Sequence, residues 1–393
     1  MAAAGQMKPR TKHRRLGGVV AVAAVTAACA ASPRVAGRPA GHAHPASVVA
    51  CTTLPIGRRS AAGASGQLAR PALLPPGVVA VAAESPSSAW AVGSGRPDEA
   101  VVVHWNGAAW TTLSLAGLPR LSALGAVAAF PGGAWAVGEY GLTQHGDGGG
   151  IAKLLIVRLT GTTMRRVPVP GLADGALVDV AAASASNAWA VGDGQLLLHW
   201  DGTAWTRTPL PAGMRDGVFT AVAASSATNA WAVTYAGRHL PPIVHWNGRR
   251  WGQVAGPDIG RPYALSDVAT TSAKDVFAVG SAPEGSSRAL LLHWNGRRWT
   301  CALTRQIHPP KFPDTFLAAV SGSSPDNAWA VGSYFDSAQR ALALHWNGHT
   351  WKQVITQPGQ EGSLDDLTFI PHSGAVWAVG GGMLLHWNGT AWH

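Results

Sequence analysis

The sequence has no stretch with the pattern of an amphipathic helix. No window of ten or more residues keeps a 3.6-residue apolar period without a Gly or Pro, so a helical domain is not expected. The local motifs of common enzymes are missing as well. There is no Gly-x-Ser-x-Gly, no His-Glu-x-x-His, no cysteine cluster and no Gly-rich phosphate loop between a strand and a helix. These absences favour a binding protein over an enzyme and predict neither a cofactor nor a metal.

Acidic residues are absent from the first 70 positions, which hold ten of the 30 Lys and Arg residues. Residues 71–393 therefore carry 20 basic and 20 acidic residues, and the formal charge of +10 belongs to the N-terminal region. A nucleic-acid-binding domain concentrates positive charge on its folded part. We expect no nucleic-acid partner. Later in the chain, like charges adjoin in pairs such as Arg249-Arg250 and Arg297-Arg298.

Residues 1–30 have the pattern of an export signal. A basic segment (8–15) precedes an apolar segment (16–25) that is too short for a transmembrane helix, and Ala28-Cys29-Ala30 fits a cleavage site. The four residues ending at Cys29 also resemble a bacterial lipobox, which implies lipidation of Cys29. Secretion and lipid anchoring at the outer face of the cytoplasmic membrane both stay open, as do the Sec and twin-arginine routes. Residues 31–46, rich in Ala, Gly and Pro, predict a flexible tether.

What the rest of the chain does contain is a repeat with three landmarks in constant order. The first is the aromatic residue of an AWAVG-like run: Trp90, Trp135, Trp189, Trp231, Phe277, Trp329 and Trp377. The second precedes a polar-Gly turn: Trp105, Leu159, Trp200, Trp246, Trp294, Trp346 and Trp387. The third follows the turn: Trp110, Met164, Trp205, Trp251, Trp299, Trp351 and Trp392.

Each copy contains four short apolar runs, which predict strands a to d. Seven copies of 42 to 54 residues with four strands each are typical of propeller blades. We therefore predict an all-β fold, a seven-bladed β-propeller of four-stranded antiparallel blades over residues 47–393. The repeats begin near residues 77, 122, 176, 218, 264, 316 and 363. A single ring of this kind is expected to be a monomer.

The last copy stops at Trp392-His393 with hardly any strand d, so an N-terminal strand is expected to close the ring. Residues 47–55 resemble strand d of other copies and are predicted to complete blade seven. Cys51 would then lie on blade seven and Cys301 on blade five, on the order of 30 Å apart at ~4.8 Å per strand. A disulfide needs Cα atoms within ~7 Å. The prediction is two free thiols.

The repeated aromatic and histidine residues have a structural interpretation. If Asn106-Gly107 forms a two-residue turn, Trp105 pairs with Ala108, and Trp110 lies on the same face as Trp105. Such tryptophans are expected to pack between blades. The histidine before the second landmark recurs in six copies, too far apart to share one zinc ion. Each is expected to hydrogen-bond to a residue of its own a–b loop: Asn187, Asn229, Asp275 or Asn327.

The copies differ at only one end of the predicted ring. The end with the a–b loops and c–d turns, called the turn end below, is repetitive. The end with the b–c and d–a loops, called the loop end, varies between copies and holds all four tyrosines. Aromatic and polar residues that do not follow the repeat pattern, gathered at one end, suggest a binding surface. The candidate ligand-binding residues are Tyr140, His145, Tyr235, Arg238, His239, Arg261, Tyr263, Tyr334 and Arg340.

The unit of strand b ending in Gly, strand c, a Gly turn and a Trp opening strand d resembles kelch and tectonin repeats over residues 77–393. Its Gly-x-x-Trp is also similar to the Asp-box of sialidase-like propellers. The double Gly of kelch repeats is matched cleanly only at Gly380-Gly381. The sialidase resemblance implies a Tyr nucleophile with Arg residues, and the kelch resemblance to copper radical oxidases implies Tyr and His ligands.

The favoured function is an exported binding module that recognises a glycan, a peptide or a cell-surface protein through its loop end. The alternative is a carbohydrate-active enzyme, either a sialidase-like hydrolase or a copper radical oxidase. Contact with a membrane is expected only through the lipid anchor. Carboxylates converging near the axis would favour the enzyme, and tyrosines scattered around an open concavity would favour binding.

Overall fold

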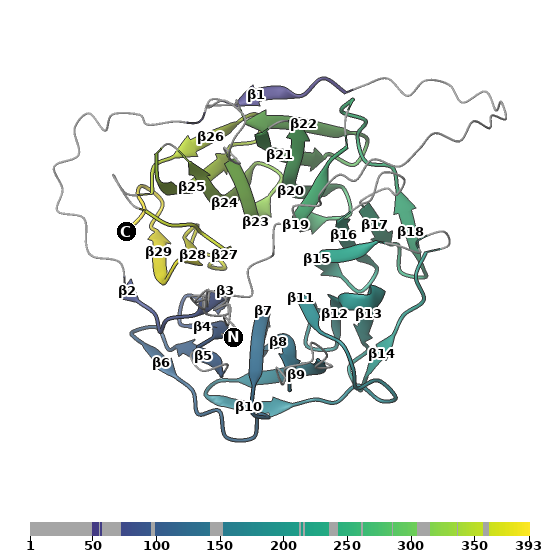
Figure 1. Ribbon diagram of the computed structural model, residues 1–393, viewed down its shortest axis with the longest axis vertical. Helices are drawn as coiled ribbons and strands as arrows, with labels where there is room; N and C mark the ends of the chain where they lie inside the picture. The colour runs from purple at the N-terminus through teal and green to yellow at the C-terminus, as the bar shows by residue number, and fades with distance from the viewer. Residues whose placement is uncertain are drawn as a thin grey trace, which may run out of the picture. The chain divides into compact units, whose positions relative to one another are not determined.

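The computed structural model describes residues 49–54, 56, 72–95, 99–141, 152–211, 214, 217–235, 243–260, 262–284, 286–304, 315–335, 337–356 and 361–393. Their strands form seven sheets arranged in a ring (Figure 1). The predicted all-β, seven-bladed propeller is confirmed. The predicted export signal, the tether and Cys29 lie outside the described residues. Within those residues, no helix is long and apolar enough to cross a membrane.

Blades one to four take their strands from the chain in sequence, from the axis outward. Blade one holds β3 (Val78–Ser85), β4 (Ser88–Ser94), β5 (Ala100–Trp105) and β6 (Trp110–Thr112). Blade two holds β7 (Ser122–Phe130), β8 (Gly133–Tyr140), β9 (Lys153–Thr160) and β10 (Thr163–Arg166). Blade three holds β11 (Leu177–Ser184), β12 (Asn187–Gly192), the short 3₁₀ helix η1 (Asp193–Gln195), β13 (Leu196–Trp200) and β14 (Trp205–Arg207). Blade four holds β15 (Val218–Ser226), β16 (Asn229–Tyr235), β17 (Ile243–Trp246) and β18 (Trp251–Val254).

Blades five to seven follow the same order, and two of them gain a strand from the N-terminal region. Blade five holds β19 (Ala264–Ser272), β20 (Asp275–Glu284), β21 (Ser286–Trp294) and β22 (Trp299–Thr304), with β1 (Thr52–Leu54) added outside β22. Blade six holds β23 (Thr315–Ser324), β24 (Asn327–Phe335), β25 (Gln339–Trp346) and β26 (Trp351–Val354). Blade seven holds β27 (Asp366–Phe369), β28 (Val376–Gly380) and β29 (Met383–Trp387), with β2 (Ala72–Leu73) on its outer edge.

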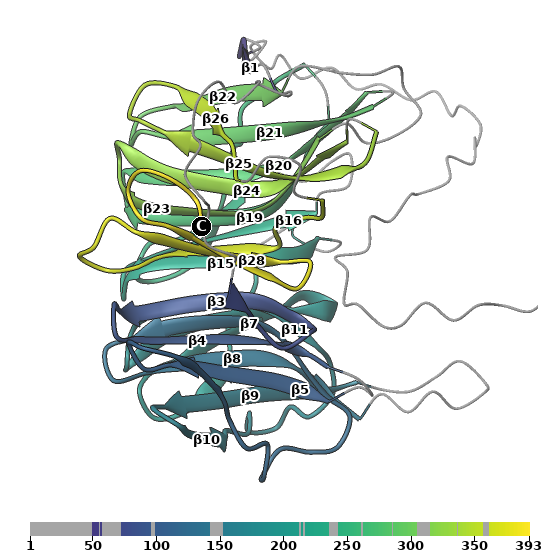
Figure 2. The same cartoon turned by 90° about the vertical axis from the view of Figure 1, so that its left-hand side faces the viewer.

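The strands run along the ring axis, as the side view in Figure 2 shows. Strand a therefore begins at the loop end, and strand b returns to it. Strand b is buried along its whole length in blade three, as expected for a sheet covered on both faces. The glycine that ends it has a steric cause, because a β-carbon on Gly192 would lie 2.1 Å from the carbonyl oxygen of Ala176.

Blade seven is completed by residues from both ends of the chain. β2 pairs antiparallel with β29, with Ala72 opposite Leu384. The terminal His393 forms two backbone hydrogen bonds of 2.9 Å with His386 on the same strand. Residues 72–73 and 392–393 thus lie one after the other along β29. Closure by an N-terminal strand is confirmed, but the prediction that residues 47–55 complete blade seven is wrong.

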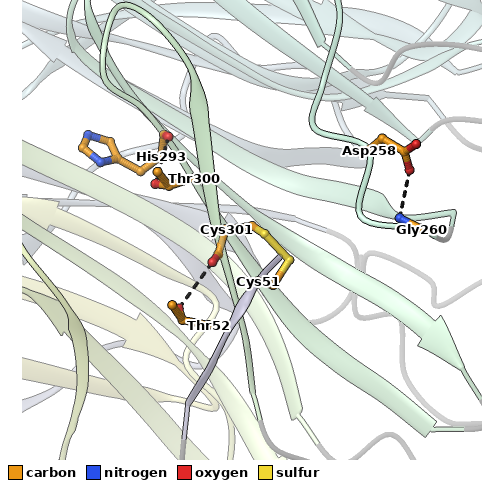
Figure 3. Close-up of a disulfide and its surroundings, with 7 residues drawn as sticks. All are labelled: Cys51, Thr52, Asp258, Gly260, His293, Thr300 and Cys301. Carbon is orange, nitrogen blue, oxygen red and sulfur yellow. Dashed lines mark hydrogen bonds between the residues drawn. A yellow bond between two sulfur atoms is a disulfide. The ribbon is translucent and has the colours of Figure 1, made fainter. Parts of the chain in front are cut away.

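The predicted closing segment lies instead on blade five, where it forms a disulfide (Figure 3). β1 pairs parallel with β22, and Cys51 is bonded to Cys301 with their Cα atoms 4.7 Å apart. Thr52 Oγ1 also donates a hydrogen bond of 3.3 Å to the Cys301 carbonyl. The prediction of two free thiols is therefore wrong. It failed because similarity to strand d placed this segment on the wrong blade, whereas the strand covers the otherwise open edge of β22.

The tryptophans pack between blades as predicted, and all 18 of them stand at the three landmarks. The first landmark of one blade contacts the second and third landmarks of the next. In blade two, the ring of Trp135 lies 4.9 Å from Trp200 and 5.3 Å from Trp205 of blade three. The same contact closes the ring, since Trp377 of blade seven lies 5.3 Å from Trp110 of blade one.

The c–d turn is longer than predicted. Trp105 pairs directly with Trp110, not with Ala108, so the loop has four residues, 106–109. The Asn106 side chain explains the register, because its Oδ1 accepts hydrogen bonds of 3.0 and 2.9 Å from the backbone N–H groups of Ala108 and Ala109. Gly107 takes the left-handed conformation at φ 93°. Both tryptophans still lie on one face, as predicted.

Candidate functional site

The four tyrosines predicted to bind ligand lie at the loop end. Tyr140 and Tyr235 end strand b of blades two and four, Tyr334 stands next to the end of strand b of blade six, and Tyr263 immediately precedes strand a of blade five. His145, Arg238, His239 and Arg261 lie outside the described residues.

Tyr140 is held by a neighbour in its own blade. Arg166 donates a hydrogen bond of 2.7 Å from Nη2 to the Tyr140 hydroxyl. The Arg166 guanidinium also lies 4.5 Å from the centre of the Tyr140 ring. Cation–π and hydrogen-bond contacts together fix the ring. This phenol is engaged within blade two.

Tyr263 and Tyr334 are largely removed from solvent. The Tyr263 hydroxyl lies so close to Gly256 that a β-carbon there would be 2.0 Å from it, and burial, with the nearby Asp258 charge, raises the pKa of this phenol. Tyr334 belongs to the hydrophobic core between blades five and six. Its cross-strand partner is Arg340, whose Nη1 lies 3.8 Å from a carboxylate oxygen of Glu361. Both tyrosines therefore contribute mainly to packing.

Tyr235 differs from the other three because half of its surface is exposed. It pairs across strands with Val218, and the exposed fractions are 50% and 48%. Val178, 36% exposed, lies near the start of β11 in the neighbouring blade, where β11 and β15 are side by side around the axis (Figure 1). We call Val178, Val218 and Tyr235 the apolar patch. Only one other large hydrophobic residue of the described chain, Ile355, is comparably exposed.

Three aspartates on the innermost strands were missed by the sequence analysis: Asp179, Asp267 and Asp366. Each occupies the same register position, opposite a valine of strand b, in blades three, five and seven. The other four blades have alanine there: Ala80, Ala126, Ala221 and Ala319. Aligning the repeats on the Ala-Val or Asp-Val pair of strand a would have revealed them.

Each of these carboxylates joins its own blade to the next. Asp179 Oδ2 accepts a hydrogen bond of 2.7 Å from Val222 N, Asp267 Oδ2 one of 2.7 Å from Val320 N, and Asp366 Oδ2 one of 2.8 Å from Val81 N. The other oxygen of each accepts from the backbone N–H of the following residue. Both oxygens are thus occupied by main-chain donors, which suits a role in holding blades together.

The same three groups resist ionisation. Burial raises the pKa of Asp179 and Asp366 to about 7 and that of Asp267 to about 8, and repulsion between the carboxylates adds to the effect. At the loop end of blade two, burial and the charge of Asp193 also raise the pKa of Glu139. Carboxylates therefore gather around the axis, as the enzyme alternative requires, but the three innermost already accept hydrogen bonds from the protein.

The predicted histidine contacts are confirmed in four blades, whereas in blade one His104 Nε2 lies 3.4 Å from Ser88 Oγ. Ring Nε2 atoms lie 2.7–2.8 Å from the predicted a–b loop side chains, in the pairs His199–Asn187, His245–Asn229, His293–Asp275 and His345–Asn327. Each ring also stacks on the first landmark of its blade, as His199 does on Trp189 at 4.1 Å. Among the described residues, no group of three or more His, Cys, Asp or Glu side chains is placed to hold a metal ion.

The comparisons with known proteins identify the fold and nothing finer. No protein-family model matches the chain, and no curated protein matches it. The structure of YCF48 bound to D1 peptide is similar, with a TM-score of 0.57 and 14% identity over 81% of this chain and 94% of that one. So is the GH74 xyloglucanase from Xanthomonas campestris, with a TM-score of 0.57 and 16% identity over 81% of this chain and 53% of that one. The propeller domain of Myceliophteria thermophila Cps50 (Swd1) has a TM-score of 0.53 and 13% identity over 81% and 99% of the two chains.

Proposed function

We propose that the protein is a non-enzymatic binding module that recognises a cell-surface partner through its loop end. The apolar patch carries the proposal. Three of the four exposed large hydrophobic side chains of the described residues gather there, on adjacent blades. Isolated exposed apolar residues need no explanation, but a contiguous group marks an interaction surface. Valines beside a tyrosine suit an extended peptide segment, and YCF48, which has a similar fold, is bound to D1 peptide in its structure.

We also propose export, by secretion or lipid anchoring at Cys29. The Cys51–Cys301 disulfide supports this part of the proposal. Disulfides persist in oxidising compartments and are rare in the cytosol. We further propose that the repeat is of the kelch or tectonin type, on the basis of the sequence resemblance. A mass shift for an acylated N-terminal Cys29 in protein purified from membranes would identify the anchored form, and an unacylated N-terminus in the culture medium would identify the secreted form.

The proposal is tested by a pull-down from cell-surface protein and cell-wall glycan fractions with the disulfide intact. Tyr235→Ala and Val218→Ser should each weaken capture at least tenfold. The matched control is Ile355→Ser, which removes an exposed hydrophobic residue (39% exposed) outside the patch. Capture that survives both patch changes would refute the assignment of the loop end. Capture from the glycan fraction alone would replace the peptide with a sugar as the ligand.

A carbohydrate-active enzyme is the second candidate. The likeness to a GH74 xyloglucanase and the raised pKa of Glu139 favour it. Glycosidases need a protonated acid near a second carboxylate, and Asp193 supplies a nearby charge. Release of reducing sugar from xyloglucan, lost in Glu139→Gln but not in Glu84→Gln, would support the enzyme. Absence of turnover, together with patch-dependent capture, supports the binding module.

A further inference from the structure

The turn end of blades four and five carries a concentration of positive charge. In both blades the c–d turn reads Asn-Gly-Arg-Arg, which gives Arg249 and Arg250 in blade four and Arg297 and Arg298 in blade five. The other turns contain no Lys or Arg: residues 106–109, 160–163, 201–204, 347–350 and 388–391. Lys274, in the a–b loop of blade five, packs beside its turn, because a β-carbon at Gly296 would lie 2.8 Å from Lys274 Cβ.

These five cations are exposed. Within the described part of the chain, their side chains form no hydrogen bond or ion pair. The nearest acid in sequence, Asp275, is 2% exposed and is already bonded to His293 at 2.7 Å. Because residues 71–393 are neutral in sum, a local excess of five charges at one place is balanced elsewhere on the ring. The side chains are available to an anionic partner.

The arginines of blade four also border a groove, and those of blade five are not part of its lining. The groove has a volume of about 520 Å³ and lies between blade four and the segment that follows β14 of blade three. Pro209, Leu210 and Pro211 form one side, and Trp246, Trp251 and the two arginines form the other. Trp246 Nε1 already donates to the Ala227 carbonyl at 3.1 Å, so the indole is held in place.

We propose that this groove binds an acidic, extended peptide segment with an apolar anchor residue. The apolar walls suit one or two hydrophobic side chains, and the guanidinium groups of Arg249 and Arg250 suit carboxylates flanking them, since Arg pairs with carboxylate in bidentate geometry. Electrostatic complementarity selects such a partner and speeds its approach. The arginines of this site stand at the turn end, and residues 209–211 belong to the d–a connection of blade three. The site shares no residue with the apolar patch and is independent of the function proposed above.

A peptide fits these observations better than a membrane or a nucleic acid. A bilayer surface is attracted by all exposed cations alike and has no segment to insert between the prolines and the indole. A nucleic-acid strand needs a longer track of cations along its backbone. Here the charged part of the lining is limited to two arginines, and Pro209, Leu210, Pro211 and two indoles make up much of the rest. We therefore expect the arginine pair of blade four to contribute more to peptide binding than the pair of blade five, whereas on a purely electrostatic surface the two pairs would contribute equally.

The test uses the full chain and a fluorescein-labelled eight-residue peptide with two central leucines flanked on each side by three glutamates. Fluorescence anisotropy at low salt should detect binding. Arg249→Glu combined with Arg250→Glu should weaken it at least tenfold, and Leu210→Gln at least threefold. The control, Arg297→Glu combined with Arg298→Glu, makes the same charge change in an identical turn that does not line this groove and should leave affinity within twofold. Circular dichroism verifies folding of each variant.

The other outcomes overturn the proposal. Equal loss in the two double variants would mean a diffuse electrostatic surface. Equal binding of a peptide in which the leucines are replaced by glycines would remove the role of the groove. If the protein binds phosphatidylglycerol vesicles but not the peptide, the cations would be assigned to a membrane. No measurable affinity for the peptide in the wild-type protein would reject the site.

Discussion

Replacing Trp189 with alanine measures how strongly the tryptophan contacts hold neighbouring blades together. Trp189 is fully buried. Its ring lies 5.0 Å from each of Trp246 and Trp251 in blade four and stacks on His199 of its own blade. A buried Trp removes roughly 150–250 Å² from water, worth at most about 4–6 kcal/mol at ~25 cal/mol/Å².

Two corrections set the expected value. The cavity left between blades adds to the transfer cost. Loss of the indole N–H offsets part of it, because this buried donor has no hydrogen-bond partner among the described residues. We expect Trp189→Ala to lower the unfolding free energy by about 3–5 kcal/mol. Trp189→Phe should cost about 1–2 kcal/mol, since Phe277 fills this position in blade five.

The assay is denaturation in guanidinium chloride, monitored by circular dichroism. Trp294→Ala is the matched control, because the ring of this half-buried tryptophan contacts one other ring among the described residues, Trp299 at 5.5 Å. It should cost clearly less than Trp189→Ala. A loss below about 1 kcal/mol for Trp189→Ala, or equal losses for the two tryptophans, would refute the argument that interblade packing of the first landmark dominates stability.

Three further predictions concern the disulfide, the buried acids and a glycine. Reduction of the disulfide, or Cys51→Ser, should lower stability by about 2–4 kcal/mol and open the N-terminal segment to proteolysis, as melting curves and limited digestion will show. The pKa of Asp267 is about 8 in the folded state, above its value in the unfolded chain. Its contribution to the unfolding free energy is therefore complete at acidic pH and is lost as pH rises through 8. The melting temperature should therefore fall between pH 6.5 and 8.5, and less so in Asp267→Ala. Gly332→Ala should cost at least about 1 kcal/mol, because its β-carbon would lie 2.0 Å from a backbone carbonyl, whereas Gly252→Ala, with free space, should be near neutral in the same denaturation assay.

Each of these has a clear contrary result. Unchanged melting and digestion on reduction would mean that β1 is held by packing alone. A pH slope that Asp267→Ala does not alter would assign the proton uptake elsewhere. The pH range of this test starts at 6.5 because burial lowers the pKa of five histidines, and below that pH their protonation makes stability rise with pH instead of falling. These histidines are His104, His199, His245, His345 and His386. Equal stability of the two glycine variants would contradict the close approach of strands a and b.

Local patterning in the sequence was sufficient for the fold. The landmarks recur because every blade meets its neighbour in the same way, as Trp135 meets Trp200 and Trp205. Hydrogen bonds from the repeated histidines to the a–b loop could also be predicted, because both partners belong to one blade and are 12 to 18 residues apart.

The candidate site was predicted less well, because exposure is not a local property. Tyr235 follows Trp231 by four residues and Tyr334 follows Trp329 by five, so their side chains point to opposite faces of their blades. Which face is covered depends on the neighbouring blade: Tyr334 packs into a core shared by two blades, while Tyr235 remains half exposed. The innermost aspartates escaped notice for a related reason. Asp179 receives one of its hydrogen bonds from Val222, 43 residues away in the next blade, and this contact exists only once the ring has closed.

By itself, the sequence determined the strands of the repeats, the number of blades and the packing of the tryptophans between blades, since each follows from a repeat that specifies its own neighbours. Only the tertiary structure decided where the non-repeating segments go. Residues 49–54 resemble a strand d, yet they lie against blade five, bonded to a cysteine 250 residues away. The outer edge of β22 offers unpaired backbone groups to an extended segment, and contacts between residues far apart in the sequence, which local pattern does not specify, place β1 there.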